Sequence, residues 1–209
     1  MALDGAFLYA VKNELSSLVG GRIDKVYQPS RDEIIIAIRS EGSTKKVLFS
    51  SGANSARVHI TETSPENPKT PPMFCMLMRK HLGGGKLISI RQDGLERILY
   101  FDFECMNEIG DMVKVTVAIE IMGRYSNIIL ISGEGRIIDA IRRVDAEMSR
   151  ERMILPGMTY TLPSKPEKIS FLYSEKEEIR EKLFSMHNND LSKCLVSTFE
   201  GISPLFARE

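Results

Sequence analysis

Residues 70–103 place a helix, a glycine corner and two strands in immediate succession. Thr70 is predicted to cap the helix, because Pro71 and Pro72 suit a first turn whose N–H groups have no partner inside the helix. The glycines at 83–85 supply the residue type that ends helices. The side chains that recur at helical spacing are Met73, Met76, Leu77 and Lys80. This order predicts a well-bounded helix that leads into β-structure.

Two apolar runs follow the glycine corner, at 87–90 and 98–103, and both are rich in β-branched or aromatic residues. They are separated by Gln92, Asp93 and Gly94, which are typical of a turn, so the runs are predicted to pair as a hairpin. The same connection carries an adjacent acid and base, Glu96 and Arg97. Neighbouring residues of a strand point to opposite faces, whereas in a turn both side chains can face one opening.

The segment before this stretch predicts one helix and four strands. Asp4 is a good N-cap for a helix near 4–19, which the glycines at 20–21 stop. Short apolar or alternating runs from residue 22 onward, with turn residues between them, predict a four-stranded meander. The apolar stripe of the first helix is Phe7, Leu8, Val11, Leu15 and Leu18.

The segment after the hairpin predicts more antiparallel strands. Its strongest signal is at 112–122, where Val113, Val115, Val117 and Ile119 alternate with other residues and so line one face of a strand. A polar break at 123–127 separates this strand from two further runs. We therefore predict an α+β fold for residues 1–165: antiparallel sheets forming a sandwich or pseudo-barrel, with flanking helices near 4–19 and 71–82.

A domain boundary is predicted near residue 165, where Pro163 and Pro166 punctuate a segment of little periodicity. Residues 166–209 are predicted to be helical, with helices at 175–186 and 191–199. Ser203 and Pro204 suit the start of another helix, which leads us to expect that the chain continues in a longer protein.

Composition excludes several classes of protein. Lysine plus arginine and aspartate plus glutamate number 28 each, so a nucleic-acid site would have to be a local patch. Cys75, Cys105 and Cys194 are far apart among apolar residues, which predicts buried free thiols rather than disulfides or a metal site. We find no signal-peptide pattern and no run of the roughly 20 apolar residues that span a bilayer. A cytoplasmic protein without a membrane partner or cofactor is expected.

Five ordered segments resemble one protein family: ALDGAFLYAVKNEL, GGRIDKVYQPSRDEI, PPMFCMLMRKHLGGG, GLERILYF and EIMGRYSNIILI. They are similar to the N-terminal (NFACT-N) domain of the RqcH/NEMF family, many bacterial members of which carry the older name fibronectin-binding protein A. The resemblance covers roughly residues 1–165 and continues over 166–209 as the start of the family's helix-hairpin-helix domain. It implies a fold like the N-terminal domain of formamidopyrimidine glycosylases.

The resemblance implies a cytosolic ribosome quality control factor for the rescue of stalled ribosomes. Such a factor binds obstructed large ribosomal subunits that carry peptidyl-tRNA, mainly through regions outside this chain. It also recruits tRNA, typically alanyl-tRNA in bacteria, and supports untemplated C-terminal tailing of the stalled peptide. The expected partners are therefore tRNA and the large ribosomal subunit.

Glu96 and Arg97 match an Asp-Arg pair that, by the resemblance, contacts the tRNA anticodon. An arginine offers a planar fork of donors and can stack on a base, and a carboxylate accepts from exocyclic amines. Glu96 keeps the charge of the usual aspartate but is one methylene longer, which leaves the tRNA preference open. Without the resemblance, the pair would be interpreted as a surface ion pair that contributes little.

The polar loop after the long strand is the second candidate tRNA contact, and it consists of Arg124, Tyr125, Ser126 and Asn127. Its residue types suit phosphate and base contacts, although a plain hairpin turn is the alternative. Tyr125 replaces the family's usual histidine, so stacking is kept while proton transfer near neutral pH is not. A basic neighbourhood of the first hairpin comprises Arg79, Lys80, His81, Lys86 and Arg91.

Three other functions compete with RNA binding. A base-excision glycosylase needs an N-terminal proline amine, whereas this chain begins Met1-Ala2-Leu3, so we expect a nucleic-acid-binding relative without enzymatic activity. A fibronectin-binding adhesin is suggested by the family's older name and opposed by the missing secretion signal. A purely structural domain would only position the rest of a longer protein.

Overall fold

The computed structural model describes residues 3–164, 167–185 and 190–208. The α-helices are α1 (Gly5–Leu15), α2 (Met73–Leu82), α3 (Lys176–Phe184) and α4 (Leu191–Thr198), and short 3-10 helices are η1 (Ser16–Leu18), η2 (Gly123–Tyr125) and η3 (Phe206–Arg208). The strands are β1 (Arg22–Ser30), β2 (Glu33–Ser40), β3 (Ser43–Ser50), β4 (Arg57–Thr61), β5 (Lys86–Arg91), β6 (Ile98–Met106), β7 (Met112–Glu120), β8 (Asn127–Ser132) and β9 (Ile137–Ala140).

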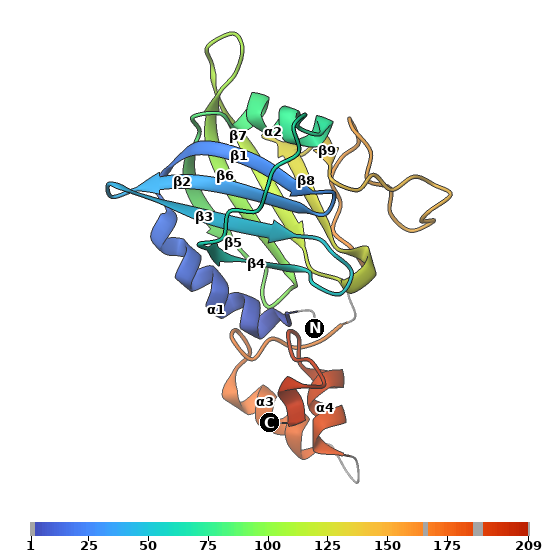
Figure 1. Ribbon diagram of the computed structural model, residues 1–209. Helices are drawn as coiled ribbons and strands as arrows, with labels where there is room; N and C mark the ends of the chain where they lie inside the picture. The colour runs from blue at the N-terminus through green and yellow to red at the C-terminus, as the bar shows by residue number, and fades with distance from the viewer. Residues whose placement is uncertain (1–2, 165–166, 186–189, 209) are drawn as a thin grey trace.

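The strands of the described residues form one antiparallel sheet in the order β4-β3-β2-β1-β5-β6-β7-β8-β9. Its two halves, β1–β4 and β5–β9, are joined where Arg22 of β1 pairs with Lys86 of β5. The first half lies across the face of the second, so the sheet folds over on itself as a sandwich (Figure 1). The predicted α+β sandwich is therefore confirmed.

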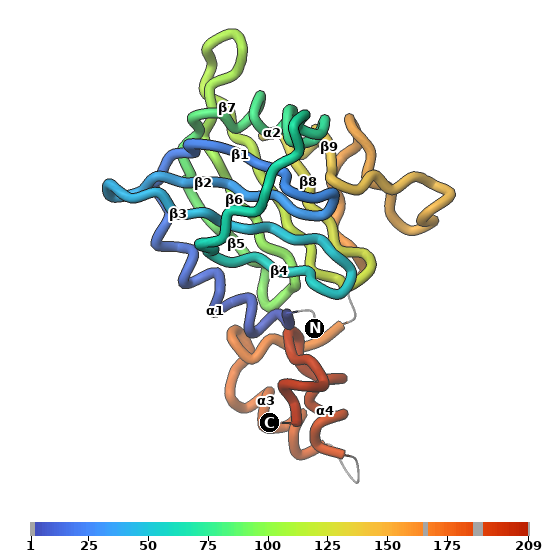
Figure 2. The backbone as a smooth tube through the Cα atoms, in the orientation of Figure 1, coloured from blue at the N-terminus to red at the C-terminus, as the bar shows by residue number. Residues whose placement is uncertain are grey.

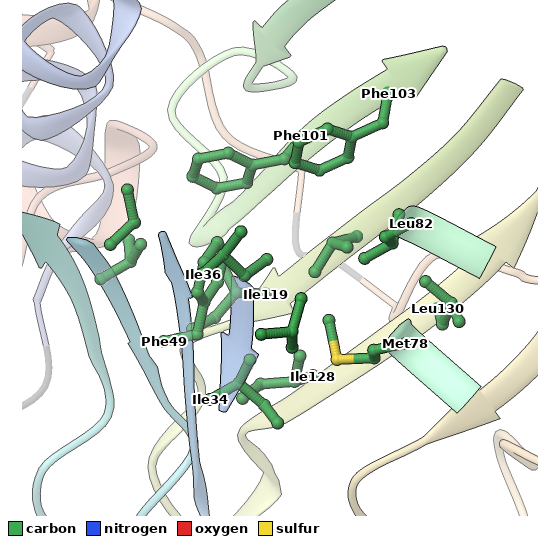
Figure 3. Close-up of a cluster of buried hydrophobic side chains, with 14 of the residues drawn as sticks. Ile34, Ile36, Phe49, Met78, Leu82, Phe101, Phe103, Ile119, Ile128 and Leu130 are labelled. Carbon is green, nitrogen blue, oxygen red and sulfur yellow. The ribbon is translucent and has the colours of Figure 1, made fainter. Parts of the chain in front are cut away.

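The core lies between the two halves and is covered at one side by α2. Phe49 of the first half meets Phe101 of the second edge-on, with ring centroids 4.8 Å apart. Figure 3 shows Met78 and Leu82 of α2 beside these strands. Alternation explains the arrangement, because every second residue of β6 and β7 points to this side. The fully buried side chains include Ile34, Ile36, Phe103, Ile119, Ile128 and Leu130.

Helix α1 is capped as predicted, since the Asp4 side chain accepts a hydrogen bond from the Phe7 N–H at 2.8 Å. Leu8 and Leu15 are buried, but Phe7 is 54% exposed, which corrects its place in the predicted stripe. One residue advances the helix by about 100°, so Phe7 points away from the face centred on Leu8 and Leu15.

Helix α2 differs from the prediction in two details. Its N-cap is Pro72 rather than Thr70, because Pro71 precedes another proline, is therefore pushed toward extended backbone and cannot be the first helical residue. Its buried stripe is not the predicted one: Met73 and Met76 are 67% and 53% exposed. The predicted glycine corner is present, and Gly84 has the positive φ of +69°. The side chains that α2 buries are Phe74, Cys75, Met78 and Leu82.

Beyond β9, the chain pairs Val144 with Ile154 and packs apolar side chains on the outer face of the second half. The predicted boundary at 165 lies outside the described residues. Helices α3 and α4 follow near the predicted positions, although Met186, the predicted end of the first, is also outside them. The assignment of residues 166–209 to the start of a helix-hairpin-helix domain stays a prediction.

Two predictions from composition can be compared with the structure. Cys75, Cys105 and Cys194 are all buried free thiols, as predicted. The helices in the described part of the chain are too short or too polar to span a bilayer.

Candidate nucleic-acid interface

The connection between β5 and β6 is a fixed loop that presents Glu96 and Arg97. Gly94 turns the chain with a φ of +53°, and the Glu96 N–H donates to the Asp93 carbonyl at 3.0 Å. The Gln92 side chain donates from Nε2 to the carbonyls of Glu96 and Gly5, each at 2.9 Å. The loop is thus tied to itself and to the start of α1.

Arg97 is exposed at the entrance to β6, while its carbonyl accepts from the Ile121 N–H at 2.8 Å. Arg97 stands just before the first residue of β6, and its side chain is exposed although the neighbouring Ile98 is buried. Arg97 and Glu96 both line one cavity of about 290 Å³. The turn therefore places acid and base at one opening.

The cavity is lined by the start of α1, the β5–β6 loop, Lys168 and the chain around Gly201. Figure 2 shows the backbone at the start of α1 beside the C-terminal segment, and the β5–β6 loop contacts both. They approach so closely that a Cβ on Gly5 would lie 1.6 Å from the Leu95 carbonyl oxygen. A Cβ on Gly201 would lie 2.4 Å from the Cβ of Leu95, and the Ala6 N–H donates to the Gly201 carbonyl at 3.0 Å. Only glycine allows this backbone contact at the two positions.

Asp4 also lines the cavity, a role that the sequence did not reveal because the residue reads as a helix cap. Its Oδ2 accepts from the Ser203 hydroxyl at 2.8 Å, so the carboxylate joins α1 to the C-terminal segment. Glu200 Oε1 accepts from the Leu95 N–H at 3.3 Å. The described lining carries carboxylates at Asp4, Glu96 and Glu200 and cations at Arg97 and Lys168. Such a mixture suits hydrogen bonding to a base better than neutralisation of phosphate alone.

The second predicted loop exposes two of its four candidate residues. The Arg124 guanidinium lies 4.7 Å from the centroid of the Tyr125 ring and donates from Nη2 to the Tyr125 hydroxyl at 2.6 Å. Ser126 and Asn127 are instead buried, which is a correction to their predicted contact role. The Ser126 hydroxyl accepts from the Met122 N–H at 2.8 Å, and Asn127 bonds to the backbone of Arg142. Both residues shape the loop because their polar groups are used inside it.

The two loops lie at the same end of the β6–β7 hairpin. Ile98, at the start of β6, pairs with Glu120, at the end of β7. Arg97 immediately precedes the first and Ile121 immediately follows the second, and they share a backbone hydrogen bond. Long-range pairing thus brings together two loops that the sequence places more than twenty positions apart.

The predicted basic neighbourhood is not gathered around Glu96 and Arg97. Lys86 pairs with Glu104 toward the other end of β6, and Lys80 forms a 3.0 Å ion pair with Glu108 beyond that strand. Arg79 donates to the Val26 carbonyl at 2.8 Å. Burial, followed by the nearby Lys80 charge, lowers the pKa of His81, so this ring adds little positive charge at neutral pH. These four residues surround the helix end and not the candidate site.

The Arg91 side chain is also used in a contact inside the protein, an ion pair with Asp102. It donates from Nε to Asp102 Oδ2 at 2.5 Å and from Nη2 to Oδ1 at 3.1 Å. Burial alone would raise the pKa of Asp102, but hydrogen bonds from Arg91, Thr116 and Ser89 hold it well below the usual range. The pair stabilises the outer face of the sheet. Within the described residues, no cluster of His, Cys, Asp or Glu side chains could hold a metal ion.

Comparison with known proteins matches this chain to a single family over nearly its whole length. The family model described as NFACT N-terminal and middle domains matches residues 4–209. The Rqc2 homolog RqcH of Bacillus subtilis is 44% identical over 211 residues, which cover 100% of this chain and 37% of that relative. The human ribosome quality control complex subunit NEMF is 32% identical over 136 residues, or 65% of this chain and 12% of the relative. The chain therefore spans little more than a third of the bacterial relative.

The fold is also shared with a solved structure. The N-terminal domain of fibronectin-binding protein PavA from Streptococcus pneumoniae superposes with a TM-score of 0.91 and 35% sequence identity. The match covers 98% of this chain and 76% of the solved one. The sandwich and the segment after it are thus shared with that domain.

Proposed function

This chain belongs to the NFACT N-terminal and middle domain family, and we propose that it is the N-terminal part of a ribosome quality control factor. The names of its relatives, Rqc2 homolog and ribosome quality control complex subunit, support this assignment. Its task in such a factor is to bind tRNA. The whole factor engages obstructed large ribosomal subunits with peptidyl-tRNA and supports C-terminal alanine tailing of the stalled peptide in the cytoplasm.

The observation that carries the tRNA proposal is the shared cavity of Asp4, Glu96 and Arg97. The two carboxylates accept hydrogen bonds from exocyclic amines of an unpaired base, and the guanidinium donates to or stacks on it. A volume of about 290 Å³ admits a base but not a duplex. We infer that an unpaired nucleotide of a tRNA loop is read here.

Arg124 and Tyr125 supply the second part of the proposed surface. The exposed Tyr125 ring offers a stacking platform, and Arg124 beside it offers a phosphate contact. Both loops lie at one end of the hairpin, so a single RNA strand can reach them together. This role requires no bond cleavage, and we propose that the chain is a binding module without enzymatic activity.

Fibronectin binding is not favoured as the function. It is suggested by the name of a structural relative, PavA, and by no feature of the described cavity. Mixed charge and an exposed Arg-Tyr pair are instead features of RNA recognition.

Copurification tests the proposed function. The recombinant chain, isolated at low salt, is expected to carry tRNA, detected by a raised ratio of absorbance at 260 to 280 nm and identified by sequencing. Arg97→Ala should lose most of this tRNA, whereas Arg39→Ala, which removes an exposed arginine from β2, should retain it. A wild-type chain free of tRNA and without affinity for added tRNA would refute the proposal.

A further inference from the structure

Arg142, just after β9, is hydrogen-bonded to both halves of the sandwich. Its Nη1 donates to the Arg124 carbonyl at 2.8 Å, and its Nη2 donates to Asp32 Oδ1 at 3.2 Å. Its backbone is held by Asn127, with N–H to Oδ1 at 3.1 Å and carbonyl to Nδ2 at 2.7 Å. One side chain therefore links the loop of Arg124 and Tyr125 to the β1–β2 turn.

The β1–β2 turn is itself firmly placed. The Asp32 carbonyl accepts from the Ser51 N–H at 2.8 Å, at the end of β3. On the other side of the contact, a Cβ on Gly123 would lie 4.0 Å from the Ala53 carbonyl oxygen, so η2 approaches the β3–β4 loop. The loop that follows β7 in the second half is thus supported by two turns of the first half.

The Arg142 link also places a further cation, Arg31, near the loop of Arg124 and Tyr125. Arg31 precedes Asp32, and its side chain is 91% exposed, with a weak 3.4 Å contact to the Asp32 carboxylate. One guanidinium spans Asp32 and the Arg124 carbonyl, so Arg31 and Arg124 lie on the same stretch of surface. Arg142 is different, because its side chain is only 30% exposed and its Nη atoms already donate to protein oxygens.

We infer that Arg142 is a positioning residue that makes one nucleic-acid surface out of the two halves of the sandwich, with Arg31 as an added phosphate contact beside Arg124 and Tyr125. The inference rests on the proposed tRNA binding. In Arg142→Lys, the ammonium group would donate from a single nitrogen and could not reproduce the two contacts, to the Arg124 carbonyl and to Asp32, that the guanidinium makes from separate nitrogens. The surface is therefore sensitive to the shape of the Arg142 side chain as well as to its charge.

Titration of labelled tRNA at several salt concentrations tests the role of Arg31. Arg31→Ala should weaken binding by roughly fivefold and reduce the slope of log affinity against log salt by about 1, as expected for one lost phosphate contact. Arg39→Ala removes an equal charge near the opposite end of β2 and should change neither quantity. Equal effects of the two variants would show that only diffuse charge matters and would overturn the assignment of Arg31.

The role of Arg142 is tested against its neighbour. Arg142→Ala should weaken tRNA binding by roughly fivefold, and Arg142→Lys should recover part of the loss. Arg143→Ala should leave binding within about twofold, because Arg143 bonds to Asp139 and not to the loop. In an Arg124→Ala/Tyr125→Ala background, Arg142→Ala should have little further effect if it acts through those residues.

Hydrogen exchange measured by mass spectrometry separates this inference from the proposed function. Arg142→Ala should speed exchange at the amides of Tyr125 and Ser126 without RNA, whereas Arg143→Ala should not. Unchanged exchange would overturn the positioning role even if tRNA binds the wild-type chain. Faster exchange with unchanged tRNA affinity would overturn the nucleic-acid surface, and absence of tRNA binding in the wild type would refute the proposed function itself.

Discussion

Arg97 gives the most direct test at the scale of single residues. Its guanidinium lines the cavity with Glu96, and losing a contact to a base should cost about 1 to 3 kcal/mol. Arg97→Ala should therefore weaken tRNA binding by roughly tenfold or more, and Arg97→Lys should recover part of the affinity. Titration at fixed salt measures both.

The exposure of Arg97 makes its effect on folding small, within about 0.5 kcal/mol in the free energy of unfolding. Chemical denaturation of the variant provides that control. Wild-type affinity in Arg97→Ala, with an intact fold, would remove Arg97 from the site.

Gly5 tests the close contact that forms the cavity. Gly5→Ala would place a Cβ 1.6 Å from the Leu95 carbonyl oxygen, so backbone has to move at a cost of about 1 to 3 kcal/mol. We expect lower stability together with weaker tRNA binding, measured by denaturation and titration.

Gly42→Ala is the matched control for Gly5. Gly42 has a φ of +80° and no atom within 4 Å of the added Cβ, so only backbone strain of about 1 kcal/mol is expected, with tRNA binding unchanged. Wild-type stability of Gly5→Ala would show that the backbone around Gly5 and Leu95 can move apart without cost.

Individual residues were predictable where local chemistry decides their place. Asp4 caps α1, and Glu96 and Arg97 lie in the turn, because caps and turns are set by short-range rules. The burial of Ser126 and Asn127 was not predictable, since it depends on Met122 and on Arg142 arriving from β9. The same holds for Gly5 and Gly201, whose neighbours are distant in sequence.

At the scale of elements, alternation and turn residues were sufficient to predict the strands in the described part of the chain. The prediction of which face α2 buries was wrong, because the exposed Met73 and Met76 are as apolar as the buried Phe74 and Met78. A helix with apolar residues on several sides leaves its orientation to the sheet that it covers. For the same reason, the placement of Lys80 and Lys86 away from Arg97 could not be read from sequence.

Asp102 on β6 makes stability depend on pH. Its pKa is depressed in the folded state relative to about 3.9 in the unfolded chain, so it stabilises the fold above that value. The contribution is lost as the pH falls through the acid range toward the folded-state pKa. Asp102→Asn should lower the free energy of unfolding by about 2 kcal/mol at pH 7, because charged hydrogen bonds are lost.

The pH profile distinguishes charge from packing at this position. The difference between wild type and Asp102→Asn should be constant from neutral pH to about 5 and should shrink below about 4. Asp24→Asn, on the exposed side of β1, should stay within about 0.5 kcal/mol of wild type at pH 7. A difference that persists unchanged into strong acid would contradict the role given to the Asp102 charge.

At the scale of the whole molecule, we expect the backbone amides of the sandwich and those of the C-terminal helices to differ in their protection from hydrogen exchange. In the described residues α3 buries no side chain and α4 buries Cys194, whereas β6 and β7 run through the core. Amide exchange in α3 and α4 should therefore be faster than in β6 and β7. Equal protection would show that the helical segment and the sandwich open as one unit.

The bond between Ser203 and Asp4 joins positions 199 apart in the sequence. A growing chain can form the strands of the sandwich before this bond, but the wall of the cavity that contains Glu200 and Ser203 arrives last. Contacts of such separation are slow to close. During its own synthesis, this protein therefore completes its sheet before its candidate RNA-binding cavity, and a chain that ends between Ala140 and Glu200 contains the strands of the sheet but not the complete cavity.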